Sequence, residues 1–420
     1  SFGLVPVVVP CFRQITLCQA SGGLLCALTH NRLALWIKFN RDRQRVAGRK
    51  RDKAGRPGDR KGAPASPRGG PRKARPASVN RERNTGRAAK VKPQQPEAAT
   101  PAPQLVDRPL TRHTGALPAE RIPLILETES DPGYQLLDSG AGEKLERYGP
   151  MRIVRPEAQA LWPRRLKPGE WDAADAVFTG DTEEDGLGRW AFPKTPLGET
   201  WPMRLMDVDF HGRLTSFRHV GVFPEQLAHW RFMVERIEAR KGAPAKVLNL
   251  FGYTGVASLI AAAAGAEVTH VDASKKAIGW ARENQALAGL VKKPVRWICD
   301  DAMKFLLREE KRGNSYDLIL TDPPKFGRGP SGEVWQLFDH LPLMLDVCRA
   351  VLSRKPIGLV LTAYSIRASF YSIHELMRET MRGAGGRVES GELIIRETGG
   401  DPSEARALST SLFSRWLPHE

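Results

Sequence analysis

The pattern of apolar and polar positions divides the chain into four regions. Residues 1–37 contain apolar residues without a clear period, and we leave this segment unassigned. Residues 38–104 are rich in Arg, Lys, Pro, Gly and Ala and contain almost no large apolar side chains. Such a segment cannot bury enough apolar surface to offset its ordering entropy, so we predict that it is disordered.

Between residues 105 and 222, short apolar runs alternate with turn signals. Runs occur at 122–126, 134–137 and 151–154, and a section punctuated by Gly and Pro follows up to Trp201. Two further runs, 203–210 and 214–217, flank His211-Gly212, which is typical of a β-hairpin. We therefore predict a small β-rich domain over 105–222.

From residue 223 onward the pattern changes to helix and strand alternation. Apolar positions at helical spacing predict an amphipathic helix over 227–239. Short apolar runs then predict strands at 246–250, 268–271, 295–298, 316–321 and 358–362. Helical segments follow them at 256–264, 275–288, 303–310, 334–352 and 370–383, and 387–397 and 409–416 end the chain as a strand pair. Repeated βα units predict an α/β domain over 223–420, with a doubly wound, mostly parallel sheet and a C-terminal antiparallel pair.

The net charge of +17 is concentrated in one stretch of the chain. Between Lys38 and Glu97 there are 20 basic and 5 acidic residues, so the rest of the chain is nearly neutral. One interpretation of this stretch is an arm that binds RNA through phosphate contacts. A solvated extension without a role explains it equally well.

Cysteines and apolar runs exclude several classes of protein. The five cysteines, Cys11, Cys18, Cys26, Cys299 and Cys348, are scattered and form no CxxC pair or Cys/His cluster. We therefore expect no disulfide framework and no metal site, and a reducing, cytoplasmic location. No apolar run reaches the ~18 residues of a membrane span, so no membrane association is expected. The chain begins with Ser rather than Met, as expected of a fragment or a processed form.

A glycine turn follows the strand at 246–250. Gly252 and Gly255 stand where a strand gives way to a helix, and glycine there lets the backbone approach a ligand closely. Ser258 occupies the place of the third glycine of a dinucleotide fingerprint, which argues against a pyrophosphate cofactor. An ordinary βα turn remains the alternative.

Carboxylates end the next two strands. Asp272 lies 20 residues after Gly252, where a carboxylate can accept hydrogen bonds from both ribose hydroxyls of a nucleoside. It could instead cap the following helix, although Ser274 is better placed as the cap. Asp300 and Asp301 close the third strand, and we expect one to contact an adenine amino group and the other to cap a helix.

The segment Asp322-Pro323-Pro324-Lys325-Phe326 ends the fourth strand. The two prolines stiffen the exit and remove backbone donors, and Phe326 can stack on a planar base. A rigid loop without function would have the same composition. The position at the carboxyl end of a central strand favours a ligand site.

These motifs together resemble the bacterial large-subunit rRNA methyltransferases. These are class I enzymes dependent on S-adenosylmethionine (SAM), and they include 5-methylcytosine formers and their N7-guanine relatives. The resemblance rests on residues 249–255, 271–277, 282–284 and 322–326, and it extends over about 205–420. Residues 223–226 resemble the family's segment that borders the SAM pocket. A Rossmann-like fold, SAM as cofactor and RNA as substrate are implied.

The resemblance also implies which residues form the site. It places cofactor contacts at Glu225, Gln226, Asn249, Phe251, Gly252, Tyr253, Thr254, Gly255, Asp272, Ala273, Asp300, Asp301, Ala302 and Asp322. Catalytic residues beside the methyl group and the target base are expected at Asp322, Pro323, Pro324, Lys325, Phe326 and Tyr364.

One departure from the family changes the expected chemistry. Its cytosine-C5 members use a cysteine just after the fifth strand, but this chain has Leu361-Thr-Ala-Tyr-Ser365 there. Cys299 and Cys348 lie on other elements and do not replace it. We therefore expect in-line transfer to a ring or exocyclic nitrogen of a flipped or single-stranded RNA base. The family's N-terminal RNA-binding domain is not recognisable, so residues 105–222 are candidates for target recognition.

Two other functions are compatible with the sequence. A methyltransferase acting on a protein or a small molecule would share every SAM motif, and the near-neutral catalytic half of the chain is consistent with one. A noncatalytic RNA-binding protein would use the basic stretch alone. A dinucleotide-dependent oxidoreductase is less favoured because of the glycine spacing.

Overall fold

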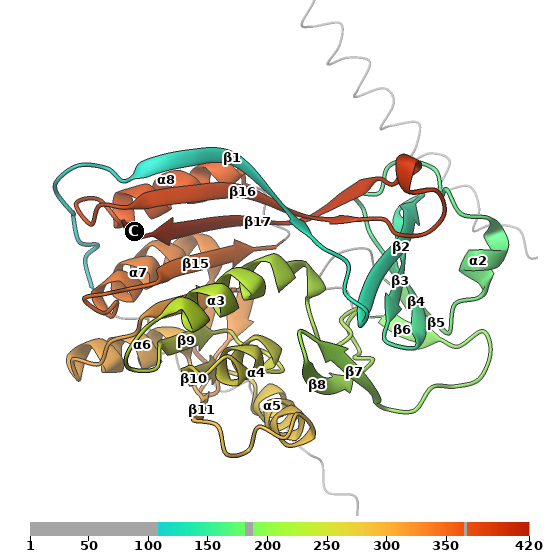
Figure 1. Ribbon diagram of the computed structural model, residues 1–420, viewed down its shortest axis with the longest axis horizontal. Helices are drawn as coiled ribbons and strands as arrows, with labels where there is room; N and C mark the ends of the chain where they lie inside the picture. Colours follow the sequence, from blue (N-terminus) through green and yellow to red (C-terminus); the bar gives the residue numbers. More distant parts are fainter. Residues whose placement is uncertain (1–107, 181–187, 365–367, 420) are drawn as a thin grey trace, which may run out of the picture. The chain divides into compact units, whose positions relative to one another are not determined.

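The computed structural model describes residues 108–180, 188–364 and 368–419 (Figure 1). The segments 1–37 and 38–104 lie outside the described residues, so the predictions made for them stay predictions. Among the described helices, none has both the length and the apolar character that a membrane crossing requires.

An eight-stranded sheet forms the centre of the larger part of the fold. Its strands lie in the order β1-β16-β17-β15-β12-β9-β10-β11. Their bounds are β1 (Ala119–Thr128), β16 (Arg387–Arg396), β17 (Ala407–Leu417), β15 (Gly358–Ala363), β12 (Leu318–Thr321), β9 (Lys246–Leu250), β10 (Glu267–Asp272) and β11 (Val295–Cys299). Only β17 runs antiparallel to its neighbours in this sheet, which confirms the predicted mostly parallel sheet with an antiparallel C-terminal pair.

Helices cover both faces of this sheet (Figure 1). The first face packs against α3 (Leu227–Ala239) and α4 (Val256–Ala263), with α5 (Lys275–Leu287) beside them. The second face packs against α6 (Ala302–Lys311), α7 (Leu337–Ala350) and α8 (Phe370–Thr380). Successive residues of β9 point to opposite faces, Val247 to the first core and Leu248 to the second. Strands buried on both faces therefore appear in the sequence as continuous apolar runs.

The order of the strands reverses between β9 and β12. From β9 the chain proceeds outward through β10 to β11, and it then crosses back to β12 on the other side of β9. In open α/β sheets this reversal leaves a crevice at the carboxyl ends of the central strands. The glycine turn after β9, the carboxylate after β10 and the Asp-Pro-Pro segment after β12 all lie at that edge.

A smaller five-stranded sheet lies between β1 and α3 in the sequence. It consists of β2 (Tyr134–Gly140), β3 (Glu143–Tyr148), β4 (Met151–Pro156), β5 (Ala176–Gly180) and β6 (Gly188–Ala191), with the short helix α2 (Pro168–Asp172). The strands β7 (Trp201–Leu205) and β8 (Val208–Gly212) form a separate hairpin, and η1 (Pro224–Gln226) leads into α3.

Three predicted elements differ from the structure. The hairpin turn lies at Met206-Asp207, both with positive φ, and not at His211-Gly212, which ends β8. A two-residue turn of this kind needs positive φ at both positions. Met and Asp are weaker sequence signals for such a turn than glycine is. The run at 122–126 belongs to β1, which pairs with β16 in the large sheet, because a short apolar run does not specify its partner. Residues 334–336 form the strand β14 and not the start of a helix, because they pair with β13 (Phe326–Arg328).

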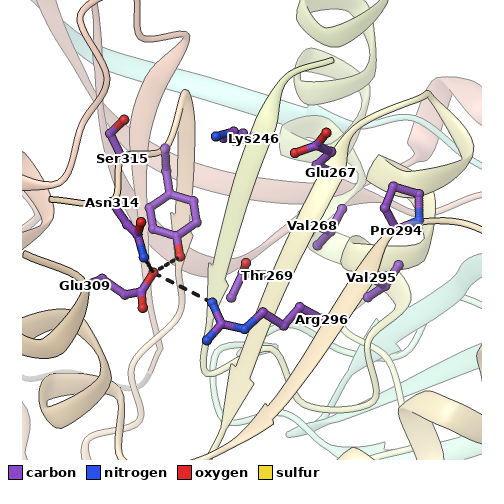
Figure 2. Close-up of a pocket in the computed structure, with 11 residues that line it drawn as sticks. Lys246, Glu267, Val268, Thr269, Pro294, Val295, Arg296, Glu309, Asn314 and Ser315 are labelled. Atoms are coloured by element: carbon purple, nitrogen blue, oxygen red, sulfur yellow. Dashed lines mark hydrogen bonds and ion pairs between the residues drawn. The ribbon is translucent and has the colours of Figure 1, made fainter. Parts of the chain in front are cut away.

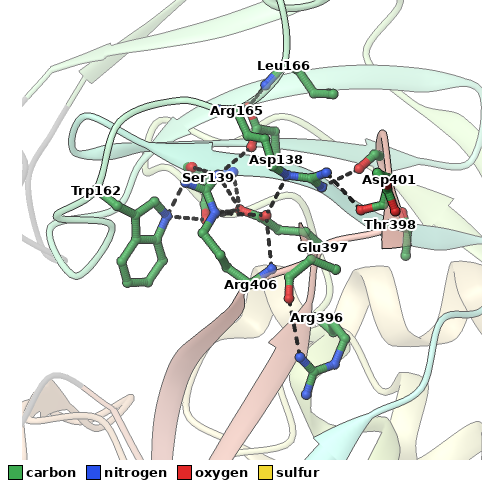
Figure 3. A network of polar contacts seen from close by, with 12 residues as sticks. Asp138, Ser139, Trp162, Arg165, Leu166, Arg396, Glu397, Thr398, Asp401 and Arg406 are labelled. Carbon is green, nitrogen blue, oxygen red and sulfur yellow. Dashed lines mark hydrogen bonds and ion pairs between the residues drawn. The ribbon is translucent and has the colours of Figure 1, made fainter. Parts of the chain in front are cut away.

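A buried polar cluster joins the small sheet to the ends of β16 and β17 (Figure 3). The Arg406 guanidinium donates to Asp138 Oδ1 at 2.7 Å and to Glu397 Oε1 at 2.9 Å. Ser139 Oγ donates to the same Glu397 oxygen at 2.6 Å. The side chains of Asp138 and Glu397 are fully buried, so these charges depend on their partners. We call Asp138, Ser139, Glu397 and Arg406 the polar clamp.

Candidate functional site

A cavity of about 360 Å³ lies at the carboxyl ends of β9, β10 and β12. Residues from the predicted site that line it are Phe251, Tyr253, Asp272, Ala273, Asp300, Asp301, Ala302, Asp322, Pro323, Pro324, Lys325 and Tyr364. A smaller space of about 40 Å³ shares Phe223, Phe251, Tyr253 and Asp322 with it. It is also lined by Gln226, Asn249, Gly252 and Thr254. The structure thus brings together most of the residues that the sequence predicted.

Another cavity, of about 420 Å³, lies at the opposite, amino-terminal edge of the sheet (Figure 2). Its buried carboxylate, Glu309, is already bonded to neighbours. Glu309 Oε2 accepts from Tyr316 OH at 2.7 Å and from Asn314 Nδ2 at 2.9 Å. Because these groups satisfy one another, this cavity offers little to a ligand, and the carboxyl edge is the better candidate.

The turn after β9 has an unusual backbone. Phe251 and Tyr253 have φ of 57° and 51°, in the left-handed region that residues with a side chain rarely occupy. The Tyr253 N–H donates to Asp272 Oδ2 at 2.9 Å, which holds the turn against the end of β10. Strained backbone of this kind is often found at ligand sites, and here both residues line the cavity.

Behind this turn lies a buried chain of polar groups that the sequence reasoning missed. Asn249 Nδ2 donates to Ser258 Oγ at 3.0 Å, and Ser258 Oγ is also 3.0 Å from His270 Nδ1. Burial lowers the pKa of His270 to about 3, so the imidazole is neutral. These bonds fix the orientation of the Asn249 amide, which borders the smaller space. Nothing in the one-dimensional pattern pairs Ser258 with His270.

Gly252 has no room for a side chain. A Cβ at this position would lie 2.4 Å from His270 Cε1 and 2.9 Å from Asn249 Nδ2. We expect Gly252→Ala to lower the free energy of unfolding by about 1–3 kcal/mol, as overpacking usually does. Gly279→Ala on α5 is the matched control, because a Cβ there meets open space. It should raise stability by about 0.5–1 kcal/mol. Urea denaturation measures both, and equal changes in the two variants would contradict this packing.

Asp272 is held with both carboxylate oxygens in use. Oδ1 accepts from Ser274 N at 2.8 Å, and Oδ2 accepts from Tyr253 N. Each oxygen retains a second lone pair for a ligand hydroxyl. Burial raises the pKa of Asp272 to about 6. The predicted cap of α5 is confirmed as Ser274, whose Oγ accepts from Ala277 N, so Asp272 does not have that role.

Asp300 and Asp301 have different partners. Asp301 is the N-cap of α6 and accepts from Lys304 N at 2.9 Å. Asp300 Oδ1 accepts from the Asp301 N–H at 2.8 Å, and its other oxygen is paired with Arg308. The capping role is thus assigned to Asp301. Both residues line the cavity, as does Ala302.

Three segments that are distant in the sequence meet at the Asp322 end of the cavity. Gln226 Nε2 donates to Asp322 Oδ2 at 2.7 Å and to Tyr364 OH at 3.1 Å. Gln226 precedes α3, Asp322 follows β12 and Tyr364 follows β15. The Gln226 amide therefore donates to both Asp322 and Tyr364 and holds these two side chains at the cavity wall.

Trp335 fixes the Asp-Pro-Pro segment from the other side. Its Nε1 donates to Pro324 O at 2.7 Å, and its ring lies 5.1 Å from that of Phe251. Trp335 was not among the predicted site residues, because residues 334–352 were predicted as one helix. An aromatic residue at the beginning of that segment was the available signal.

Three predicted site residues line neither the main cavity nor the smaller space. Glu225 lies near Lys144, Arg155 and Glu146 of the small sheet, and burial raises its pKa. Phe326 is half exposed on β13. Gly255 caps α4 with φ of 82°, one residue beyond Thr254. Lys325, by contrast, lines the cavity as predicted.

The lining fits a nucleoside without phosphates. Asp272 offers carboxylate lone pairs suited to ribose hydroxyls, and Phe251, Val271 and Trp335 supply apolar surface. The turn lacks the third glycine of a pyrophosphate site, since Ser258 is buried against Asn249. These features fit the adenosyl group of SAM, and the smaller space beside Gln226 and Asn249 offers amide groups for its amino acid end.

Comparisons with known proteins agree with this cavity. Residues 182–353 match the model of the S-adenosylmethionine-dependent methyltransferase family. The crystal structure of the SAM-dependent methyltransferase from Agrobacterium tumefaciens is 67% identical, with a TM-score of 0.72, and the alignment covers 75% of this chain and 99% of that one. SMU.776 in complex with SAH is 14% identical, with a TM-score of 0.50 over 68% of this chain and 75% of its own, and shares the fold.

Curated relatives match over shorter stretches. The ribosomal RNA large subunit methyltransferase K/L of Pseudoalteromonas atlantica is 28% identical over 273 residues, 59% of this chain and 36% of that protein. The protein of the same name from Shewanella baltica is 38% identical over 118 residues, 28% of this chain and 16% of that protein. The chain thus spans about a third or less of the length of these relatives.

This chain is 67% identical to the Agrobacterium tumefaciens enzyme and covers 99% of it, which establishes the family of the chain. The strand order confirms the predicted Rossmann-like fold, and the family match confirms the predicted cofactor. The chain belongs to the SAM-dependent methyltransferase family, and its cofactor is SAM.

Proposed function

We propose that this enzyme methylates a base of RNA and that large-subunit rRNA is its substrate. The proposal rests mainly on the hydrogen bonds that Gln226 makes to Asp322 and Tyr364 at one end of the SAM cavity. The oxygen atoms of Asp322 and Tyr364 can orient a base there. The names of the curated relatives support rRNA as the class of acceptor.

The roles of the cofactor residues follow from their contacts. Bound SAM supplies a methyl group on an activated sulfonium, so positioning provides much of the rate. Asp272 would hold the ribose hydroxyls, and Asp301 and Ala302 border the place for adenine. Asn249 and Gln226 would hold the amino acid end in the smaller space.

The acceptor residues favour transfer to nitrogen. Asp322 Oδ2 and Tyr364 OH are held by Gln226 and can accept hydrogen bonds from an amino or ring N–H of a base. Cys299 is exposed at the end of β11 and Cys348 is buried in α7, and neither lines the cavity. The chain therefore supplies no thiolate from these positions for a covalent adduct at cytosine C5.

Binding of SAM should weaken in mild acid. Because the pKa of Asp272 is raised to about 6, the carboxylate is charged above that pH and protonated below it. A protonated carboxyl offers fewer acceptors to the ribose, so we expect SAM affinity to fall by up to about tenfold for each pH unit below 6. Calorimetry measures SAM affinity from pH 5 to 8. Asp272→Asn is the control, because its SAM affinity should not depend on pH over this range. A wild-type affinity without pH dependence would contradict the assignment.

Labelled methyl transfer tests the proposed acceptor. The chain is incubated with tritiated SAM and with rRNA or tRNA from a strain that lacks the enzyme. We expect label in large-subunit rRNA, sensitive to ribonuclease, and located by mass spectrometry in a nitrogen-methylated nucleoside. Label that survives ribonuclease in cell extracts would indicate a protein or small-molecule acceptor and contradict the proposal. Label in a 5-methylated cytosine would contradict the nitrogen chemistry.

The other regions have proposed roles as well. We propose target recognition for residues 105–222, except β1, which is part of the large sheet. We propose RNA binding for the basic stretch within 38–104, which lies outside the described residues. Removal of residues 1–104 should weaken RNA binding and reduce its dependence on salt, and it should leave SAM affinity unchanged.

A further inference from the structure

Aromatic rings form the wall of the cavity next to Tyr364. The ring of Phe223 lies 5.3 Å from that of Tyr364, 5.8 Å from that of Tyr253 and 5.0 Å from that of His219. His219, Phe223 and Tyr364 all line the main cavity. Because Tyr364 also bonds to Gln226 beside Asp322, this wall lies at the Asp322 end of the cavity, and Phe223 borders the smaller space as well.

The small sheet holds the segment that carries this wall. His219 and Phe223 lie between β8 and η1, in a segment without regular structure. Arg155 Nη1 of β4 donates to Arg218 O at 2.9 Å, and Trp190 Nε1 of β6 donates to Thr215 O at 2.6 Å. Thr215 Oγ1 in turn donates to His219 O at 3.1 Å. The backbone at His219 is therefore held from the small sheet, and Gly221 two residues later accepts from Thr254 Oγ1 of the turn after β9 at 2.6 Å.

The imidazole of His219 is neutral near pH 7. Burial lowers its pKa to about 3, and the cations Arg155, Arg218 and Lys144 act in the same direction. A neutral imidazole presents one N–H donor and one nitrogen acceptor, and its face can stack.

We propose that His219 and Phe223 form a subsite for the planar heteroaromatic ring of the acceptor, in which Phe223 supports the face of the ring and His219 hydrogen-bonds its edge. The identity of that ring as an RNA base rests on the proposed function. An aliphatic amine or carboxylate of a protein has no face to stack and would gain little from this wall.

Two substitutions of His219 separate stacking from hydrogen bonding. His219→Phe keeps a ring against Phe223 but removes both nitrogens, and His219→Asn keeps a donor and an acceptor but removes the ring. Phe223→Leu removes the supporting face. Phe217→Ala is the matched control, because Phe217 is exposed on the same segment and does not line the cavity.

Binding of nucleotides to the enzyme gives a readout that does not require activity. The probes are the four nucleoside 5′-monophosphates, added to protein saturated with S-adenosylhomocysteine so that the cofactor site is closed to them. Saturation-transfer NMR identifies the nucleotide that binds. We expect its dissociation constant to rise about tenfold in His219→Phe and in Phe223→Leu, as for the loss of one hydrogen bond or one stacked ring. His219→Asn should be affected less than His219→Phe if the edge contact dominates. The Phe217→Ala value should equal that of the wild type.

SAM affinity and RNA methylation complete the test. Calorimetric SAM affinity should stay within about twofold of wild type in both His219 variants and in Phe217→Ala, while kcat/KM for RNA falls about tenfold in His219→Phe. Phe223 also lines the smaller space beside Gln226, so Phe223→Leu is assessed by nucleotide binding alone. Unchanged nucleotide binding in both His219 variants would overturn the subsite, as would an equal loss of SAM affinity. If the wild type binds nucleotides through His219 but labels no RNA, the proposed function fails and the subsite stands. If no nucleotide binds to the wild type, the subsite is wrong.

Discussion

Asp272→Asn should weaken SAM binding by about 100-fold. The carboxylate holds the turn through Tyr253 N and Ser274 N and has lone pairs left for two ribose hydroxyls. Asparagine has the same shape, but its NH₂ group faces a donor at one of these positions. The loss of one charge-assisted bond and a clash of donors together cost about 3 kcal/mol, which is about 100-fold in affinity. Isothermal titration calorimetry measures the change.

The control for this variant is Asp207→Asn. Asp207 is exposed at the β7–β8 turn, with positive φ that asparagine tolerates. Its SAM affinity should match that of the wild type, and both variants should retain the wild-type circular dichroism spectrum. An Asp272→Asn protein that binds SAM normally would show that the ribose is held elsewhere.

The second large effect is expected in the polar clamp. Arg406→Met should lower the free energy of unfolding by about 3 kcal/mol, because it removes the one cation that donates to both the Asp138 and Glu397 carboxylates. Arg165, 3.4 Å from Glu397 Oε2, remains as a weaker partner. Urea denaturation followed by tryptophan fluorescence is the measurement. Trp162 and Trp171 lie beside this cluster and report on the small sheet.

Arg396→Met provides the matched comparison on the same strand pair. Arg396 pairs with Glu127, and both side chains are about two-fifths exposed, so solvent screens the interaction. Exposed pairs of this kind contribute about 0–1 kcal/mol. If Arg396→Met destabilised the enzyme as much as Arg406→Met, burial of the clamp would not explain its strength.

The parallel part of the fold follows closely from local sequence. Both β9 and α3 have the predicted bounds, because a buried strand is a continuous apolar run and a surface helix repeats its apolar positions every three to four residues. The same patterns placed Asp272 and Asp322 at strand ends. Since parallel strands share one carboxyl edge, the cofactor side of the site could be assembled from spacing alone.

The remaining features depend on contacts that no local pattern encodes. The pairing of β1 with β16 joins residues more than 250 positions apart in the chain. Trp335 reaches Pro324 only because β13 and β14 fold back as a hairpin. His219 enters the cavity because β4 and β6 hold its segment, and these contacts cannot be predicted from the residues next to it in the sequence.

A crystal structure of the enzyme with S-adenosylhomocysteine tests the central assignment most directly. We predict the ribose hydroxyls on the Asp272 carboxylate, the adenine beside Asp301 and Ala302, and the sulfur directed toward Asp322, with the rings of Phe223 and His219 left free for the acceptor. A ligand in the cavity at the amino-terminal edge of the sheet, or one whose sulfur points away from Asp322, would contradict the account.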